Sequence, residues 1–118
     1  MKHHVNPSSA NWVGRHSDSQ LYWHEFVQLV NDLQIKKIQD TKIAMLGYAV
    51  DAGVISNGGR SGAKDGPDSI RKMLGPLANH VNETTLVYDY GNIVVEDDDM
   101  DAAQLLMRDT IFTCLQEN

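Results

Sequence analysis

An unbroken apolar segment, IAMLGYAV, follows Lys42 and ends at Val50. It is too short for a typical helix and suits a strand that is buried on both faces, as in a parallel sheet. The segment TTLVYDYG over residues 84–91 predicts a second strand. With a helix between them, the two strands form a β–loop–α–β unit with the right-handed crossover expected of parallel strands.

Apolar residues at helical spacing predict three helices. The first covers about residues 20–33, where Tyr22, Phe26 and Leu33 fall on one face. The second begins at Pro67, because the first turn of a helix tolerates proline, and Gly75-Pro76 ends it. We expect its apolar stripe to pack on the sheet; the stripe consists of Ile70, Met73, Leu74 and Leu77.

The third helix covers about residues 98–116 and begins with several carboxylates, which suit the positive end of its dipole. The first 19 residues are polar and predict an arm rather than a packed element. Residues 20–118 then form an α/β domain, and 118 residues leave no room for a second one. Two buried strands cannot complete a sheet with helices on both faces, so we expect the domain to be unfinished.

Composition excludes several classes of protein. A net charge of −6 argues against general nucleic-acid binding. No segment has the 18 or more apolar residues of a membrane span, and the N-terminus lacks an apolar signal core. Cys114 is the only cysteine, so no internal disulfide can form, which fits a cytoplasmic protein.

The segment over residues 51–66 is a long glycine-rich loop after the first strand. Its glycines match neither the phosphate-binding spacing Gly-x-x-x-x-Gly-Lys-Ser/Thr nor the dinucleotide fingerprint. A loop at the carboxyl end of a buried strand is nevertheless where α/β proteins bind ligands. Asn57, Arg60 and Lys64 are the polar side chains that could contact one. The alternative is that the glycines serve backbone geometry and the cations face solvent.

The remaining polar residues predict no catalytic or metal site. The acidic segment 96–101 lacks the glycine and distal glutamate of a calcium loop. The five histidines have no ligand spacing to one another or to a carboxylate. Cys114 has no basic neighbour in sequence, so a buried thiol is expected.

Four segments in order carry a resemblance: WVGR at 12–15, YWHEFV at 22–27, LGYAVDAGVISNGGRSGAKDGPDSIRK at 46–72 and VYDYGNI at 87–93. Together they resemble the N-terminal third of formimidoylglutamases, which are members of the arginase/agmatinase (ureohydrolase) family. The resemblance extends from Trp12 to about Cys114. It implies a three-layer α/β/α arginase-like fold with a mainly parallel sheet, here truncated after about two strands.

The resemblance also implies an activity. In the family, two manganese ions turn a bridging water into hydroxide, which attacks N-formimidoyl-L-glutamate and yields L-glutamate and formamide in histidine degradation. Family members commonly assemble as homo-oligomers. The metal-binding segments of the family, of the types Gly-Gly-Gly-His-Glu, Asp-Ala-His-x-Asp and Ser-x-Asp-x-Asp, do not occur in this sequence. The chain is therefore expected to bind no metal and to be inactive alone.

In the family the loop over residues 51–66 borders the mouth of the active site. By that resemblance Arg60 is expected to pair with a substrate carboxylate, with Asn57 as a weaker neighbour. Two alternatives stay open. The chain could be a free-standing, non-catalytic interaction module that satisfies its open sheet edge by association, or a small anion-binding α/β domain.

Overall fold

The computed structural model describes residues 1–35, 42–51, 58–59, 61–81 and 83–116. Its sheet is built around β4 (Leu86–Ile93). Along one edge of β4 runs β3 (Lys42–Tyr48), in parallel. The other edge pairs with two short strands, β2 (Gln28–Leu29) in parallel and β1 (His4–Val5) in the antiparallel sense. The α/β class is thus confirmed, with a mixed sheet of four strands instead of about two.

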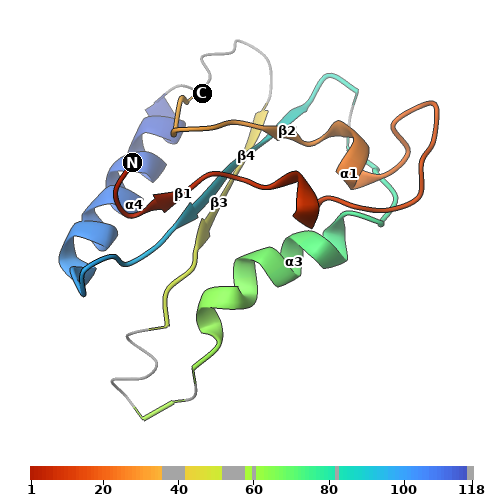
Figure 1. Cartoon of the computed structure of the whole chain (residues 1–118). Helices are drawn as coiled ribbons and strands as arrows, with labels where there is room; N and C mark the ends of the chain where they lie inside the picture. The colour runs from red at the N-terminus through yellow and green to blue at the C-terminus, as the bar shows by residue number, and fades with distance from the viewer. Residues whose placement is uncertain (36–41, 52–57, 60, 82, 117–118) are drawn as a thin grey trace.

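Two helices flank this sheet on opposite sides, α3 (Gly66–Leu74) on one and α4 (Met100–Gln116) on the other (Figure 1). Both helices were predicted with nearly these bounds. Pro67 lies in the first turn of α3, and Gly75 is its C-cap. At the start of α4 the Asp99 carboxylate accepts a hydrogen bond from the backbone N–H of Ala102, which confirms the role expected of the acidic segment.

The prediction of a helix over residues 20–33 is wrong. Only α1 (Trp23–Phe26) is helical, and Val27 has extended dihedral angles. The chain then forms β2, and the Val30 N–H donates to the Asp89 carbonyl of β4 at 2.9 Å. Pairing with the edge of β4 therefore overrides the local helical spacing of the apolar residues. Three short 3₁₀ or helical turns precede the long helices; they are η1 (Ser9–Asn11), α1 and η2 (Ala63–Asp65).

The N-terminal segment is not an unpacked arm. Its strand β1 pairs with the last residues of β4, in the register His4 with Ile93. The His3 carbonyl accepts the Val94 N–H at 2.9 Å. Side chains from this segment are buried although most of them are polar; they are His3, His4, Asn11 and Trp12. His4 and Trp12 have their hydrogen-bond partners on β4, and the His3 ring accepts the Glu96 N–H.

The apolar stripe of α3 does not pack on the sheet as predicted. Ile70 is 63% exposed and Met73 is 73% exposed, whereas Arg71 between them is 3% exposed. The helix is rotated so that a charged residue faces β4, because β4 presents a buried carboxylate there. Strand β3 also departs from the prediction of burial on both faces, since Ile43 and Ala44 are exposed.

The core lies mainly between β4 and α4. Tyr88 and Tyr90 of β4 pack with Val30, and partly buried residues such as Leu46 and Cys114 surround them. Along β4 every residue from Val87 to Ile93 is buried. Within the described residues, no helix has the length and apolar character needed to cross a membrane.

Candidate functional site

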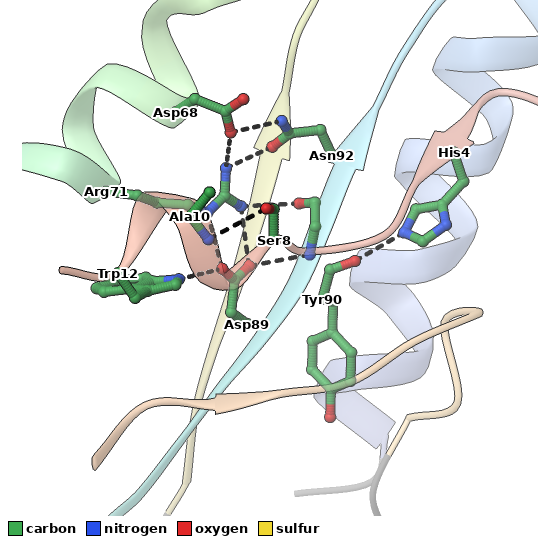
Figure 2. Close-up of polar contacts among 10 residues, drawn as sticks. His4, Ser8, Ala10, Trp12, Asp68, Arg71, Asp89, Tyr90 and Asn92 are labelled. Carbon is green, nitrogen blue, oxygen red and sulfur yellow. Dashed lines mark hydrogen bonds and ion pairs between the residues drawn. The ribbon is translucent and has the colours of Figure 1, made fainter. Parts of the chain in front are cut away.

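A group of polar side chains, all buried except Asp68, lies where β4, α3 and the N-terminal segment meet (Figure 2). We call it the Asp89 cluster. Asp89 of β4 is fully buried, and Arg71 of α3 is 3% exposed. The cluster consists of Trp12, Asp68, Arg71, Asp89 and Asn92, with the backbone of Gly91.

A bulge in β4 brings two of these side chains to one face. The pairing with β3 goes from Met45–Asp89 to Gly47–Asn92, so β4 has one extra residue in this interval. In a regular strand residues three apart point to opposite faces. The extra residue cancels that alternation, and Asp89 and Asn92 both turn toward α3, while Tyr90 points away from it (Figure 2).

Glycine is required at two positions around this bulge. Gly91 has φ of +83°, and a Cβ there would overlap the carbonyl oxygen of Val5 in β1. A Cβ on Gly47 would overlap the Asn92 Oδ1. Gly91 thus allows both the backbone turn and the close approach of β1, and Gly47 leaves space for the Asn92 amide.

Arg71 donates through all five of its N–H groups. Its Nε and Nη2 bind the two oxygens of Asp89, each at 2.9 Å, in a bidentate pair. The second Nη2 hydrogen is donated to the Gly91 carbonyl at 2.9 Å. Nη1 contacts the Asn92 Oδ1 at 2.6 Å and the Asp68 Oδ1 at 3.2 Å. No donor of the guanidinium is left over for a ligand.

The Asp89 carboxylate is equally occupied. Besides the two Arg71 bonds, its Oδ2 accepts the indole N–H of Trp12 at 2.8 Å, and its Oδ1 accepts the Gly91 N–H at 2.9 Å. The Asn92 amide in turn donates to Asp68 at 3.1 Å. A buried ion pair with every lone pair and proton satisfied is stable in place, whereas loss of one partner leaves an uncompensated charge.

The Asp89 cluster therefore acts as a structural clasp. It ties three parts of the chain together: the N-terminal segment through Trp12, α3 through Arg71, and the bulge of β4 through Asp89 and Asn92. The glycine-rich loop connects β3 to α3. Because the clasp fixes the position of α3, it also fixes the end of the loop that joins this helix. A further contact supports the same side, because the ring of His4 donates to the Tyr90 carbonyl at 2.7 Å.

The two residues predicted to contact substrate, Asn57 and Arg60, lie outside the described residues. In the described part of their loop the Gly62 N–H donates to the Asp51 carboxylate at 3.1 Å, and the Asp65 N–H donates to the Gly62 carbonyl at 3.0 Å. The substrate-binding role of Asn57 and Arg60 therefore stays a prediction. Among the described residues, no three His, Cys, Asp or Glu side chains are grouped so that they could hold a metal ion.

Among the described residues, Glu25 and Cys114 have shifted pKa values. Hydrogen bonds from the Ser17 hydroxyl and backbone, and from the Tyr22 N–H, lower the pKa of Glu25. Its side chain is 9% exposed and fastens residues 17–22 onto α1. Burial raises the pKa of the Cys114 thiol, which is half-buried on α4 and not fully buried as predicted.

Sequence reasoning missed the Asp89 cluster, although one indication was available. A single glycine inside a strand pattern, as in VYDYGNI, often marks a bulge or a close backbone approach. The residues of the cluster also come from the segments that carry the family resemblance. Trp12 belongs to WVGR, Arg71 to the long central segment, and Asp89 and Asn92 to VYDYGNI.

The geometry defines the class of protein as an α/β domain with a mixed sheet between helices. Within that class the chain is similar to the formimidoylglutamases of Salmonella paratyphi B, Salmonella typhi and Citrobacter koseri, with 45% identity over 75 residues to each. The resemblance to this family found in the sequence is thus confirmed over 75 residues, fewer than the span from Trp12 to about Cys114 that was expected. The match covers 64% of this chain and 24% of each relative, so the chain spans about a quarter of the curated relatives it matches. No family model and no solved structure matches the chain.

Proposed function

We propose that this chain is the N-terminal part of a formimidoylglutamase-like hydrolase with an arginase-like α/β/α fold. The complete enzyme hydrolyses N-formimidoyl-L-glutamate to L-glutamate and formamide in histidine degradation, in the cytoplasm. The observation that supports this proposal is the 45% identity over 75 residues to proteins of that name. The parallel pair of β3 and β4 with helices on both sides is consistent with it.

In this proposal the chain supplies part of the structural framework and the loop at the mouth of the active site. It does not supply the residues that carry out hydrolysis. The Asp89 cluster holds α3 in a fixed position on β4. The end of the glycine-rich loop that joins α3 is therefore fixed as well. Arg60 in that loop pairs with a carboxylate of the substrate, and Asn57 assists it. Formimidoylglutamate carries two carboxylates, so a guanidinium at the rim gives both orientation and charge neutralisation.

The family's two manganese ions supply a hydroxide nucleophile when they are bound. The described residues of this chain do not offer a ligand set for them. We therefore assign the metal ligands to sequence that this chain does not contain. In this proposal we expect the isolated chain to have no formimidoylglutamase activity.

A chimera tests the proposal. The whole chain replaces the matched region of the Citrobacter koseri formimidoylglutamase, and formamide release is measured with manganese present. We expect activity within about tenfold of the parent enzyme, because 1.4 kcal/mol of imperfect packing changes a rate by that factor. A chimera that folds by circular dichroism but releases no formamide contradicts the proposal. Turnover by the isolated chain contradicts the assignment of the metal ligands.

The role of Arg60 is tested in the same chimera. Arg60→Ala should raise KM for formimidoylglutamate about tenfold or more, because a charge-assisted bidentate contact contributes about 1.5–3 kcal/mol. Lys72→Ala is the matched control, since it removes one exposed positive charge from α3 without touching the loop. An unchanged KM for Arg60→Ala removes this residue from the substrate site.

A non-catalytic interaction module is the second candidate function. The observation that favours it is the exposure of large apolar side chains on α3, among them Ile70 and Met73. A chimera without activity, together with a defined homo-oligomer of the isolated chain in a sizing experiment, would favour this candidate over the hydrolase.

A further inference from the structure

Two adjacent histidines, His3 and His4, join the N-terminal segment to β4 and to the turn that follows β4. Both side chains are buried, with 6% and 8% of their surface exposed. The Nε2 of His4 contacts the Tyr90 carbonyl at 2.7 Å (Figure 2). The Nδ1 of His3 contacts the backbone N–H of Glu96 at 3.1 Å. The two rings thus meet partners of opposite kinds, a carbonyl acceptor and an amide donor.

These partners determine which ring nitrogen carries a proton. A backbone N–H can only donate, so the Nδ1 of His3 accepts and carries no proton. A carbonyl oxygen can only accept, so the Nε2 of His4 is protonated. An imidazolium has an N–H group at both nitrogens. Protonation therefore removes the acceptor of His3 but leaves the donor of His4 in place.

The ring contact of His3 belongs to a set of bonds that attach the same short segment. The His3 carbonyl accepts the Val94 N–H at 2.9 Å, and the next residue, His4, pairs with Ile93 in the antiparallel register of β1 and β4. His3 itself has φ of +63°, in the left-handed region that few residues other than glycine adopt. Such a conformation persists only where surrounding contacts maintain it. Loss of the ring contact therefore weakens the attachment of the whole strand β1.

Charged side chains lie on both of the segments that His3 joins. Lys2 forms an ion pair with Asp97 of the turn at 2.8 Å. The charged residue within β4 is Asp89, which is paired with Arg71. The turn and the start of α4 are acidic; their carboxylates are Glu96, Asp97, Asp98, Asp99 and Asp101. Carboxylates as a class titrate below about pH 5, whereas imidazole is the side chain that changes its charge between about pH 5 and pH 8. A pH change within that interval therefore acts mainly on the histidines.

We infer that His3 is a proton-sensitive latch, which releases strand β1 from β4 when the pH falls. The attached state needs an unprotonated Nδ1 on His3, whereas the detached state exposes this nitrogen to water, where it takes up a proton. The detached state thus binds more protons, so attachment weakens as the pH decreases. Release frees the edge of β4 that β1 covers, at Asn92 and Ile93. The inference is independent of the proposed function.

Hydrogen exchange of single amides, followed by NMR on the full chain, tests the latch. The quantity compared is the protection factor, which is the intrinsic exchange rate divided by the measured rate at the same pH. The Val94 and Glu96 amides donate to His3, and they should lose protection about tenfold between about pH 7.5 and about pH 5.5, as expected for release coupled to one proton. The Val30 amide donates to the Asp89 carbonyl in the same strand and should change by less than about twofold.

Two substitutions separate the roles of the histidines. His3→Asn places an amide oxygen where Nδ1 accepts, keeps a residue type that tolerates positive φ, and removes the titration. The protection of the Val94 amide in this variant should be the same at both pH values. His4→Gln is the matched control, because its amide nitrogen donates to the Tyr90 carbonyl as Nε2 does. The pH response of the parent chain should persist in His4→Gln.

The His3 ring gives a second readout that needs no substitution. Long-range proton–nitrogen correlation spectra of the parent chain report which ring nitrogen is protonated, and above neutral pH this should be Nε2 in His3. A proton on Nδ1 overturns the inference, and so does a pH response that His3→Asn retains or that His4→Gln abolishes. Equal loss of protection at Val30 also overturns it, because the whole chain is then unfolding in acid and β1 is not released by itself.

Discussion

Strands β4 and β3 are neighbours in one sheet, but they are completed in different ways. In β4 every residue from Val87 to Ile93 is buried, and its charged residue is paired within the Asp89 cluster. In β3, Ile43 and Ala44 are exposed, and the outer edge pairs with no described strand. Charged side chains are usually exposed and large apolar ones buried, but on α3 the charged Arg71 is buried and the apolar Ile70 is exposed.

This difference indicates which contacts the chain makes by itself. The hydrogen bonds of the Asp89 carboxylate and the Arg71 guanidinium are made within the described residues, so they stabilise this chain whether or not anything else is bound. The apolar surface around β3 contributes little until something covers it, because hydrophobic stabilisation is proportional to the apolar area removed from water. Substitutions on the two sides should therefore have very different effects on the free energy of unfolding.

Arg71→Ala should have the largest effect. It leaves the fully buried Asp89 without its ion pair, which costs about 3–5 kcal/mol of unfolding free energy. Urea denaturation followed by circular dichroism measures the loss, and the variant is expected to be largely unfolded if the parent is only marginally stable. Lys72→Ala, on the exposed side of the same helix, should change stability by less than about 0.5 kcal/mol. Equal effects of the two substitutions would show that the clasp is not stabilising.

Gly91→Ala comes next. The new methyl group would meet the Val5 carbonyl, at a residue with positive φ, so it should both strain the bulge and displace β1. We expect a loss near the upper end of about 1–3 kcal/mol, measured by the same denaturation. The control is Gly66→Ala at the start of α3, where a Cβ meets nothing within 4 Å. That variant should be neutral or slightly more stable.

Trp12→Phe removes one hydrogen bond from Asp89 but keeps an aromatic ring in place. The carboxylate retains its Arg71 pair, so we expect a smaller loss of about 1 kcal/mol. Differential hydrogen exchange should place the added mobility in the first twelve residues and not in α4. Uniform exchange over the whole chain would contradict a role confined to anchoring the N-terminal segment.

Glu25→Gln gives an effect that depends on pH. The pKa of Glu25 is lowered in the folded protein, mainly by the Ser17 hydroxyl, so its ionised form stabilises the fold above the ordinary value of 4.5. This contribution is lost as the pH falls through the folded-state pKa. The stability difference between parent and variant should consequently be present at pH 7 and shrink below about pH 4.5, in thermal melts over a pH series. A difference independent of pH would contradict the assignment.

Ile70→Ser should have the smallest effect on the isolated chain. The side chain is largely exposed, so we expect a change within about 0.5 kcal/mol, even though an apolar residue of a predicted core stripe is replaced. Urea denaturation of this variant beside Arg71→Ala sharpens the contrast, since the two residues are adjacent in sequence. A loss of several kcal/mol would place Ile70 in the core after all.

The elements with strong local patterns were predictable from sequence. β3, β4, α3 and α4 follow from continuous apolar segments, from Pro67 and Gly75, and from the acidic start of α4. What failed depends on contacts distant in sequence. The packing of residues 1–12 and the extended backbone after Val27 both result from the edges of β4.

The rotation of α3 could not be predicted from periodicity. Its apolar stripe indicates one buried face, but the ion pair between Arg71 and Asp89, eighteen residues apart, selects another. For the candidate site, the sequence identified the glycine-rich loop and the resemblance to a family. The substrate contacts of Asn57 and Arg60 remain a prediction. The bulge at Gly91 was indicated by a glycine within a strand pattern, but the partner of Asp89 was not.

The pairing of β1 with β4 also bears on how the protein forms during synthesis. His4 leaves the ribosome well before its partner Ile93 has been synthesised. Until then the N-terminal segment has no strand to join, and the Trp12 indole has no Asp89 to bind. Closing so long a loop is slow compared with forming local helices. The clasp is therefore a late event, and a nascent chain that stalls before β4 cannot assemble any part of this sheet.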